Sequence, residues 1–159
     1  MRKILLYLSF VCLSFHTFSK DVKDNFNKNI IGTWSCSTSY KDEAGFEFID
    51  QFKETFFQDG SVKVSGDVQY FDSLEKAKVK YKYNAKWKNE NNELIFTDFT
   101  TQHYEVDNKK FEVEHELKPL FEFSAQDIEI ASIKRLTSKN LDYQLQTEDE
   151  EYYKIQCNR

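Results

Sequence analysis

The sequence is poor in the residues from which catalytic motifs are built. It contains three His, four Gly and one Pro, with neither a Gly-x-Ser-x-Gly nucleophile elbow nor a Gly-rich phosphate-binding loop. His103 and His115 are the histidines outside the first twenty residues, and neither belongs to a recognisable motif. Neighbouring residues of a strand point to opposite faces, so His115 cannot share a site with both adjacent Glu. We therefore expect no enzymatic activity, no metal site and no cofactor.

Positive charge is also in the minority. The 22 Lys and Arg are outnumbered by 27 Asp and Glu, which gives a net charge of −5 at pH 7. Nucleic acids and anionic membranes are bound largely through basic side chains, so this balance argues against both partners. Aromatic residues, in contrast, are abundant, with 15 Phe and 9 Tyr. Aromatic enrichment with little Gly and Pro indicates a folded, strand-rich protein.

Long hydrophobic runs are confined to the N-terminus. Residues 4–15 are mostly apolar and follow the basic pair Arg2 and Lys3. The run is too short to span a bilayer as a helix, and the small residues Thr17 and Ser19 follow it. This layout predicts a signal peptide over residues 1–19 that is cleaved after Ser19. We expect residues 20–159 to form a single exported domain, periplasmic or secreted, without membrane insertion.

Cysteine is rare, with three residues in the chain. Cys12 lies in the predicted signal peptide, which leaves Cys36 and Cys157 in the mature protein. In an oxidising compartment an even count of cysteines indicates a disulfide. Closing a loop of about 120 residues would stabilise the fold by about 4–5 kcal/mol at most. Two free buried thiols are the alternative.

From Thr33 onwards, apolar and polar residues alternate with the period of two that is typical of strands. Asp59-Gly60 predicts a hairpin turn, and Gly66 within a strand predicts a bulge or sharp bend. Residues 107–125 predict a short helix or an irregular insert, because Pro119 argues against a long helix. The pattern predicts an all-β fold of eight to nine antiparallel strands, either an up-and-down barrel or a sandwich. A disulfide between the first and last strands favours the barrel.

The alternation places one set of aromatic side chains on the inward faces of these strands. The candidate ligand-binding residues of this interior are Phe48, Phe52, Phe56, Tyr81, Tyr83, Trp87 and Phe96. Asp50, Glu54 and Asp98 fall on the same faces. Buried carboxyl groups need partners, so these acids either lie near a wet open end or orient a polar group of a ligand. Side chains of this size could instead fill the interior completely, and the sequence leaves both possibilities open.

One strand carries Lys at every second residue from Lys78 to Lys82, and again at Lys86 and Lys88, so that these side chains share its outer face. Lys on an outer wall discourages edge-to-edge association of sheets, and acidic neighbours on adjacent strands would pair with it. The alternative is a docking surface for an acidic partner. The solvated wall is the simpler interpretation.

The sequence Gly32-Thr33-Trp34 resembles the Gly-x-Trp motif that opens the first strand of lipocalins and of lipocalin-like (calycin-type) bacterial exported proteins. The resemblance implies an eight-stranded barrel in which Gly32 and Trp34 are structural, with Trp34 packed across the closed end. It also implies an Arg from late in the chain against that Trp, and Arg135 or Arg159 could serve.

Two functions follow from this interpretation. The first is a non-enzymatic exported binding protein that holds a small hydrophobic or amphipathic molecule inside the barrel. The second is a periplasmic protein-binding module of the inhibitor or immunity type, which acts through its outer wall or rim. An open cavity would favour the first function, and a filled interior with an intact Lys wall would favour the second.

Overall fold

The computed structural model describes residue 26 and residues 28–146 and 152–159. The predicted signal peptide, residues 1–19, lies outside the described residues. The strands are β1 (Gly32–Lys41), β2 (Glu47–Phe56), β3 (Ser61–Phe71), β4 (Lys76–Glu90), β5 (Glu93–Val106), β6 (Glu129–Leu136), β7 (Asn140–Gln146) and β8 (Tyr152–Asn158). Between β5 and β6 lie the helix α2 (Lys109–Glu114) and the 3-10 helix η1 (Lys118–Phe121).

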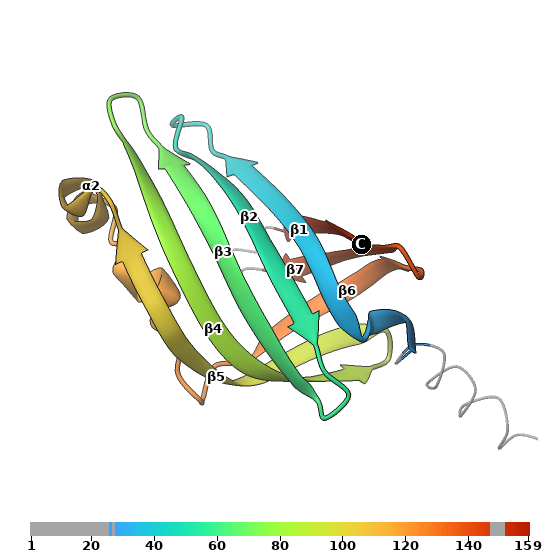
Figure 1. Ribbon diagram of the computed structural model, residues 1–159. Helices are drawn as coiled ribbons and strands as arrows, with labels where there is room; N and C mark the ends of the chain where they lie inside the picture. The colour runs from blue at the N-terminus through green and yellow to red at the C-terminus, as the bar shows by residue number, and fades with distance from the viewer. Residues whose placement is uncertain (1–25, 27, 147–151) are drawn as a thin grey trace, which may run out of the picture.

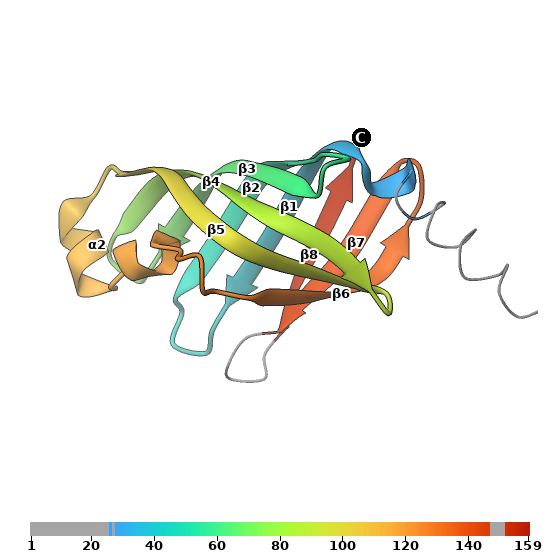
Figure 2. The same ribbon diagram turned by 90° about the horizontal axis from the view of Figure 1, so that it is seen from below.

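The eight strands form a closed barrel. Each strand pairs antiparallel with the next one in the chain, and β1 pairs with β8 to complete the circuit. Figures 1 and 2 show the strands winding around one interior, with α2 at one end and the C-terminus at the other. The expected all-β, antiparallel up-and-down barrel is confirmed. Its strands number eight, and the insert expected near residues 107–125 contains the two short helices.

The seam between β1 and β8 is short. Its register consists of Ser35 opposite Asn158, Cys36 opposite Cys157 and Ser37 opposite Gln156. Cys36 and Cys157 are joined by the predicted disulfide, across a sequence separation of 121 residues. The covalent bond therefore lies in the strand pairing that closes the barrel.

The end of the barrel that holds the C-terminus is sealed by side chains, and we call it the closed end. Trp34 is fully buried there, and its Nε1 donates a hydrogen bond of 2.8 Å to the carbonyl of Ile30. The guanidinium of Arg159 lies 4.1 Å from the Trp34 ring and donates to the carbonyls of Ile31 (2.7 Å) and Asn29 (2.8 Å). Of the two candidate arginines, Arg159 therefore contacts the tryptophan.

Arg135 has a different role. It extends from β6 and donates through Nε to Asp142 on β7, at 2.8 Å, with half of its side chain exposed. This surface ion pair lies between neighbouring strands, so the arginine that covers Trp34 is Arg159.

At the opposite, open end, β5 and β6 separate. They pair only from Glu93–Ser132 to Phe96–Glu129, although β5 continues to Val106. The chain that follows η1 crosses the resulting gap. Thr101 on β5 donates from Oγ1 to the carbonyl of Phe121 at 2.6 Å and accepts from the Phe123 amide at 3.2 Å. The insert thus completes the wall where the sheet is not hydrogen-bonded.

Gly66 does not form the bulge that its position in a strand predicts. The register through β2, β3 and β4 is continuous, with Gly66 opposite both Phe52 and Tyr81. A Cβ at this position would lie 2.6 Å from the Phe52 Cβ and 2.7 Å from the Tyr81 Oη. The glycine therefore makes room for the Tyr81 side chain against the inner face of the sheet.

Candidate functional site

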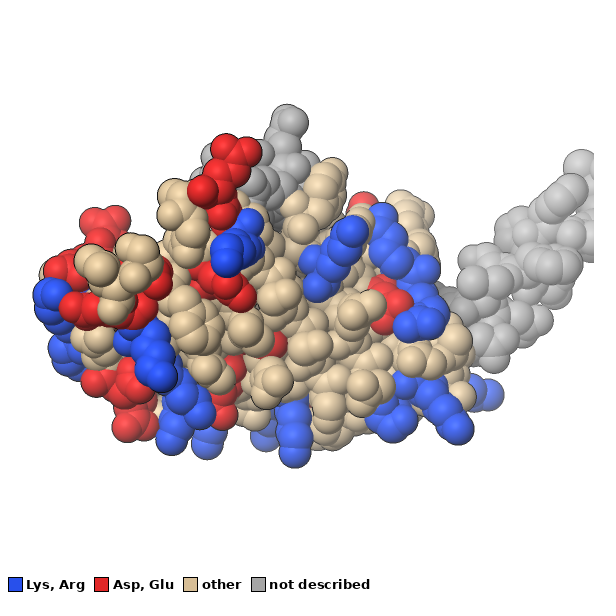
Figure 3. All heavy atoms as spheres, turned by 90° about the horizontal axis from the view of Figure 1, so that it is seen from above, with Lys and Arg blue, Asp and Glu red and all other residues tan. Residues whose placement is uncertain are grey.

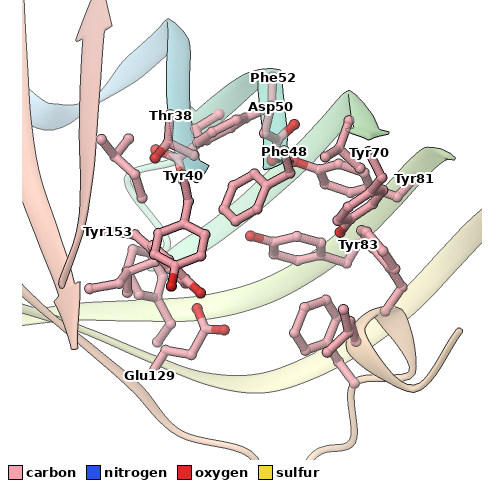
Figure 4. A pocket seen from close by; sticks show the side chains of 18 of the residues that line it. Thr38, Tyr40, Phe48, Asp50, Phe52, Tyr70, Tyr81, Tyr83, Glu129 and Tyr153 are labelled. Carbon is pink, nitrogen blue, oxygen red and sulfur yellow. Dashed lines mark hydrogen bonds between the residues drawn. The ribbon is translucent and has the colours of Figure 1, made fainter. Parts of the chain in front are cut away.

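The open half of the barrel contains a cavity of about 340 Å³. Aromatic rings from seven strands and from the insert make up most of its wall, as Figure 4 shows for those that are labelled. This volume is at the small end of the range for ligand pockets. The interior is therefore packed at the closed end and hollow towards the open end, a distribution that the sequence left undecided.

Five of the seven candidate lining residues border this cavity, and they are Phe48, Phe52, Tyr81, Tyr83 and Phe96. They come from β2, β4 and β5. Tyr81 and Tyr83 are stacked, with ring centroids 6.1 Å apart and an interplanar angle of 11°. Because the rings pack on one another, their positions are held by neighbours as well as by the backbone.

The other two candidates, Phe56 and Trp87, do not border the cavity. Both face inward, but both lie near the closed end. Phe56 is 1% exposed and packs edge-to-face on Trp87, with centroids 5.5 Å apart. The Trp87 Nε1 donates to the carbonyl of Phe57 at 3.3 Å. Alternation identifies the face of a strand, whereas the height along the barrel axis depends on strand tilt and stagger.

Further aromatic residues border the cavity although sequence reasoning did not select them. These are Tyr40, Tyr70, Phe121, Phe123, Tyr143 and Tyr153. Tyr143 and Tyr153 lie on the two late strands, where alternation of apolar and polar residues was visible and could have identified them. Phe121 and Phe123 belong to the insert, whose path over the β5–β6 gap has no periodic signal.

Asp50 is one of the acids that border the cavity. It lies on β2 directly opposite Thr38 on β1, and its Oδ2 accepts a hydrogen bond of 2.7 Å from the Tyr81 hydroxyl. Its Oδ1 and the Oγ1 of Thr38 are both buried without a hydrogen-bond partner. Burial raises the pKa of Asp50 to about 7, against the lowering effect of the Tyr81 hydrogen bond. Both residues that carry these unpartnered oxygens border the cavity.

Glu54 lies four residues further along β2 and is 2% exposed. Its Oε1 accepts from the Tyr143 hydroxyl at 2.8 Å, and its Oε2 lies 3.7 Å from the Sγ of Cys36. A disulfide sulfur carries no proton, so Oε2 receives no hydrogen bond from it. Burial raises the pKa of Glu54 to about 8. The carboxyl group therefore holds its proton near neutral pH when the cavity is empty.

Glu129 is a third cavity acid, which sequence reasoning missed because it follows the insert. It opens β6 opposite Phe96, and burial raises its pKa to about 7. Asp98, in contrast, was expected on an inner face but does not reach the interior. It is exposed, with a φ of 53°, at a register shift between β4 and β5, and Phe99 is buried instead. The extra residue of a bulge reverses the facing of the residues that follow it, here as far as the second register shift, between Lys82 and Tyr83 of β4.

Among the described residues, those that line the cavity include carboxyl groups but no basic side chain. Within the same part of the chain, the group of three possible metal ligands is Cys36, Glu54 and Cys157, and its two sulfurs are bonded to each other rather than available as thiolates. His103 and His115 lie outside the cavity, where each is close to a carboxylate: Glu105 at 3.6 Å and Asp72 at 2.9 Å. The arrangement provides an apolar container with acidic and hydroxyl groups inside it.

No helix among the described residues is long and apolar enough to cross a membrane.

Comparison with known proteins found similarity only at the level of architecture. Neither a protein-family model nor a curated protein matches the sequence. One similar structure is a de novo designed fluorescence-activating β-barrel, at 10% identity and a TM-score of 0.43, over 85% of this chain and 97% of that chain. Another is a redesigned β-barrel, mFAP1, bound to DFHBI, at 12% identity and a TM-score of 0.44, over 85% and 99%. The barrel assignment rests on the strand pairing of this chain.

Proposed function

We propose that the protein is a non-enzymatic binding protein that holds one small amphipathic molecule in the barrel. The observation that carries this proposal is the cavity of about 340 Å³, with an aromatic wall and the buried, unpartnered Thr38 Oγ1 and Asp50 Oδ1. Buried polar atoms without partners are costly, so such atoms in a native cavity suggest groups that a ligand satisfies. The apolar wall supplies affinity and the oxygens supply orientation.

The closed end supports a lipocalin-like assignment within this proposal. Trp34, from the Gly-x-Trp sequence, plugs the barrel near the start of β1 and is covered by Arg159. This is the placement that the resemblance implies. The disulfide between Cys36 and Cys157 supports a location outside the reducing cytoplasm. Export through the predicted signal peptide, residues 1–19, is part of the proposal.

A protein-binding module of the inhibitor or immunity type is the alternative, and it would act through the outer wall. The Lys side chains of β4 do face outward, and Lys78 pairs with Asp67 of β3 at 3.5 Å. Such pairing is the ordinary state of a solvated wall. Because the interior is hollow rather than filled, the cavity gives the small-molecule function the stronger support.

Native mass spectrometry of the mature protein, purified from its own host, tests the proposal. We expect an added mass that is lost on denaturation. Leu145→Trp, which places an indole in the cavity lining, should lower the fraction of protein that carries the added mass. Ser39→Trp, on the exposed outer face of β1, should leave that fraction unchanged. A bare protein that also fails to take up neutral apolar dyes would contradict the proposal and direct attention to a protein partner.

A further inference from the structure

The charge that the described cavity lining can carry has one sign. Asp50, Glu54 and Glu129 border it, and the described residues of its lining include no Lys, Arg or His. A fatty acid or another anionic ligand would bring its carboxylate next to these acids with no cation to pair it. A ligand with a positive group would instead satisfy the acids. The negative charge that the wall can carry therefore restricts the class of ligand more narrowly than the apolar area of the wall does.

Two residues of the wall that carry unpartnered oxygens lie side by side on neighbouring strands. Thr38 and Asp50 are opposite residues on neighbouring strands, and residues in this position have Cβ atoms about 5 Å apart. Tyr81 already donates to Asp50 Oδ2, which leaves Oδ1 and the Thr38 Oγ1 buried and unpartnered. An ammonium group carries three donors and no acceptor, which matches a carboxylate oxygen beside a hydroxyl oxygen.

Aromatic rings surround this pair. Figure 4 shows Phe48 and Tyr70 beside Asp50, with Tyr83 projecting into the same space. Ring faces attract cations, and the attraction is larger in a desolvated site. The same rings provide an apolar surface for the remainder of a small molecule.

From this arrangement we propose that the cavity binds an organic cation, a small amine whose ammonium group contacts Asp50 and Thr38 while its apolar body lies among the aromatic rings. The inference rests on the proposed function and specifies its ligand class. Glu54, below Asp50 on the same strand, and Glu129, across the cavity on β6, add negative potential around the bound cation.

Loops at the open end carry the same sign of charge. The loops 42–46 and 72–75 and the insert 107–128 contain Lys109, Lys110 and Lys118 as their Lys residues. Their acidic residues are Asp42, Glu43, Asp72, Glu75, Asp107, Glu112, Glu114, Glu116, Glu122 and Asp127. In Figure 3, red side chains gather around the end that carries α2, and blue ones predominate towards the other end. An acidic mouth raises the local concentration of cations and speeds their entry.

The rival ligand class is a neutral molecule with a carbonyl or hydroxyl group. Protonated Asp50 and Glu54 could donate to such a group, since burial holds their pKa values at about 7 and 8. A neutral ligand would not distinguish Asp50 from its amide isostere strongly, whereas a cation would. The dependence of affinity on ligand charge, and the effect of Asp50→Asn on that dependence, therefore distinguish the two classes of ligand.

The test is a calorimetric titration of the mature protein with three ligands that share a naphthalene ring: 2-(1-naphthyl)ethylamine, 2-(1-naphthyl)ethanol and 1-naphthylacetate. At about pH 8 the amine is still protonated, and we expect it to bind at least about tenfold more tightly than the alcohol. The carboxylate should bind most weakly. Asp50→Asn, which keeps an acceptor for Tyr81, should remove most of the preference for the amine, and Glu90→Gln at the far end of β4 should keep it.

The outcomes separate the two levels of the proposal. Equal affinity for amine and alcohol, or an amine preference that survives Asp50→Asn, would overturn the organic-cation inference but leave a small-molecule barrel. Absence of binding by all three ligands would overturn both. If Asp50→Asn does not fold, Thr38→Val and the wild-type ligand series decide the question, because the amine preference must appear in wild type and fall in the Thr38 variant.

Discussion

At the scale of single residues, the interior depends on a position without a side chain. Gly66 leaves the space that Tyr81 occupies, and Tyr81 in turn donates to Asp50. A glycine, a tyrosine and an aspartate from three adjacent strands thus form one packed unit. The glycine is necessary for space rather than for unusual backbone angles, since nothing in its register departs from a regular strand.

Gly66→Ala should destabilise the protein. The new methyl group would lie 2.6 Å from the Phe52 Cβ and 2.7 Å from the Tyr81 Oη, so at least one side chain must move. We expect the free energy of unfolding to fall by about 1–3 kcal/mol in urea denaturation. Ser65→Ala, the neighbouring position on the outer face, is the control and should change it by less than about 0.5 kcal/mol. An unchanged Gly66→Ala stability would show that the space is not needed.

The two arginines offer a matched comparison at the closed end. Arg159 packs over Trp34 and donates to three carbonyls, those of Asn29, Ile31 and Ser138. We expect Arg159→Ala to lower the free energy of unfolding by about 1–2 kcal/mol. Arg135→Ala removes only a surface ion pair and should cost at most about 1 kcal/mol. Thermal melts monitored by tryptophan fluorescence would rank them, and equal effects would contradict the sealing role of Arg159.

At the scale of secondary-structure elements, the weak places are the two seams of the barrel. β1 and β8 share three register pairs and β5 and β6 share four. The first seam contains the disulfide, and the second is covered by the insert through Thr101 and the rings of Phe121 and Phe123. Each short pairing is thus reinforced by a different means.

The contribution of the first seam can be tested by removing its disulfide. Replacing both Cys36 and Cys157 by Ser should lower the free energy of unfolding by up to about 4–5 kcal/mol, because the bond closes a very long loop. Hydrogen exchange should then rise first in the amides of β8, because three register pairs with β1 are what holds this seam once the bond is removed. Reductant should mimic this change in wild type and have no effect on the double variant. Unaltered exchange in β8 would contradict the seam's dependence on the bond.

At the scale of the whole molecule, the buried acids link stability to pH. Burial raises the folded-state pKa of Asp50 and Glu129 to about 7 and that of Glu54 to about 8, above unfolded values of 3.8 for Asp and 4.5 for Glu. The folded protein therefore holds these protons more tightly than the unfolded chain does. The stabilisation is complete below the unfolded pKa values and is lost as pH rises through the folded ones.

We therefore expect ligand-free protein to become less stable between about pH 4 and about pH 8. Asp72 acts in the opposite direction only at lower pH, since amide hydrogen bonds from Glu75 and Leu74 and a bond from His115 lower its pKa to about 2. Denaturation midpoints across this range would show the decline. Glu54→Gln should flatten it, and Glu90→Gln should not. A profile that rises from pH 4 to pH 8 would contradict the burial of these acids.

Much of this architecture could be predicted from the sequence because its signals are local. Alternation in residues 33–40 and 76–88 identifies strands and faces, an even number of cysteines after the predicted signal peptide indicates the disulfide, and Gly32-Thr33-Trp34 marks the sealed end. Each signal depends on neighbours in the chain or on simple counting. The inward orientation of Phe48, Tyr81 and Phe96 followed from the period of two alone.

The tertiary structure decided what these signals do not contain. The stagger of the strands placed Phe56 and Trp87 near the closed end and left the interior hollow towards the open end. A bulge at Asp98 turned that acid outward, and the path of the insert added Phe121 and Phe123 to the wall. Such features depend on long-range pairing between strands, which a period of two cannot encode. The sequence by itself thus determined a stapled barrel with aromatic inner faces, and only the closure of that barrel brought Thr38, Asp50, Glu54 and Glu129 around one cavity.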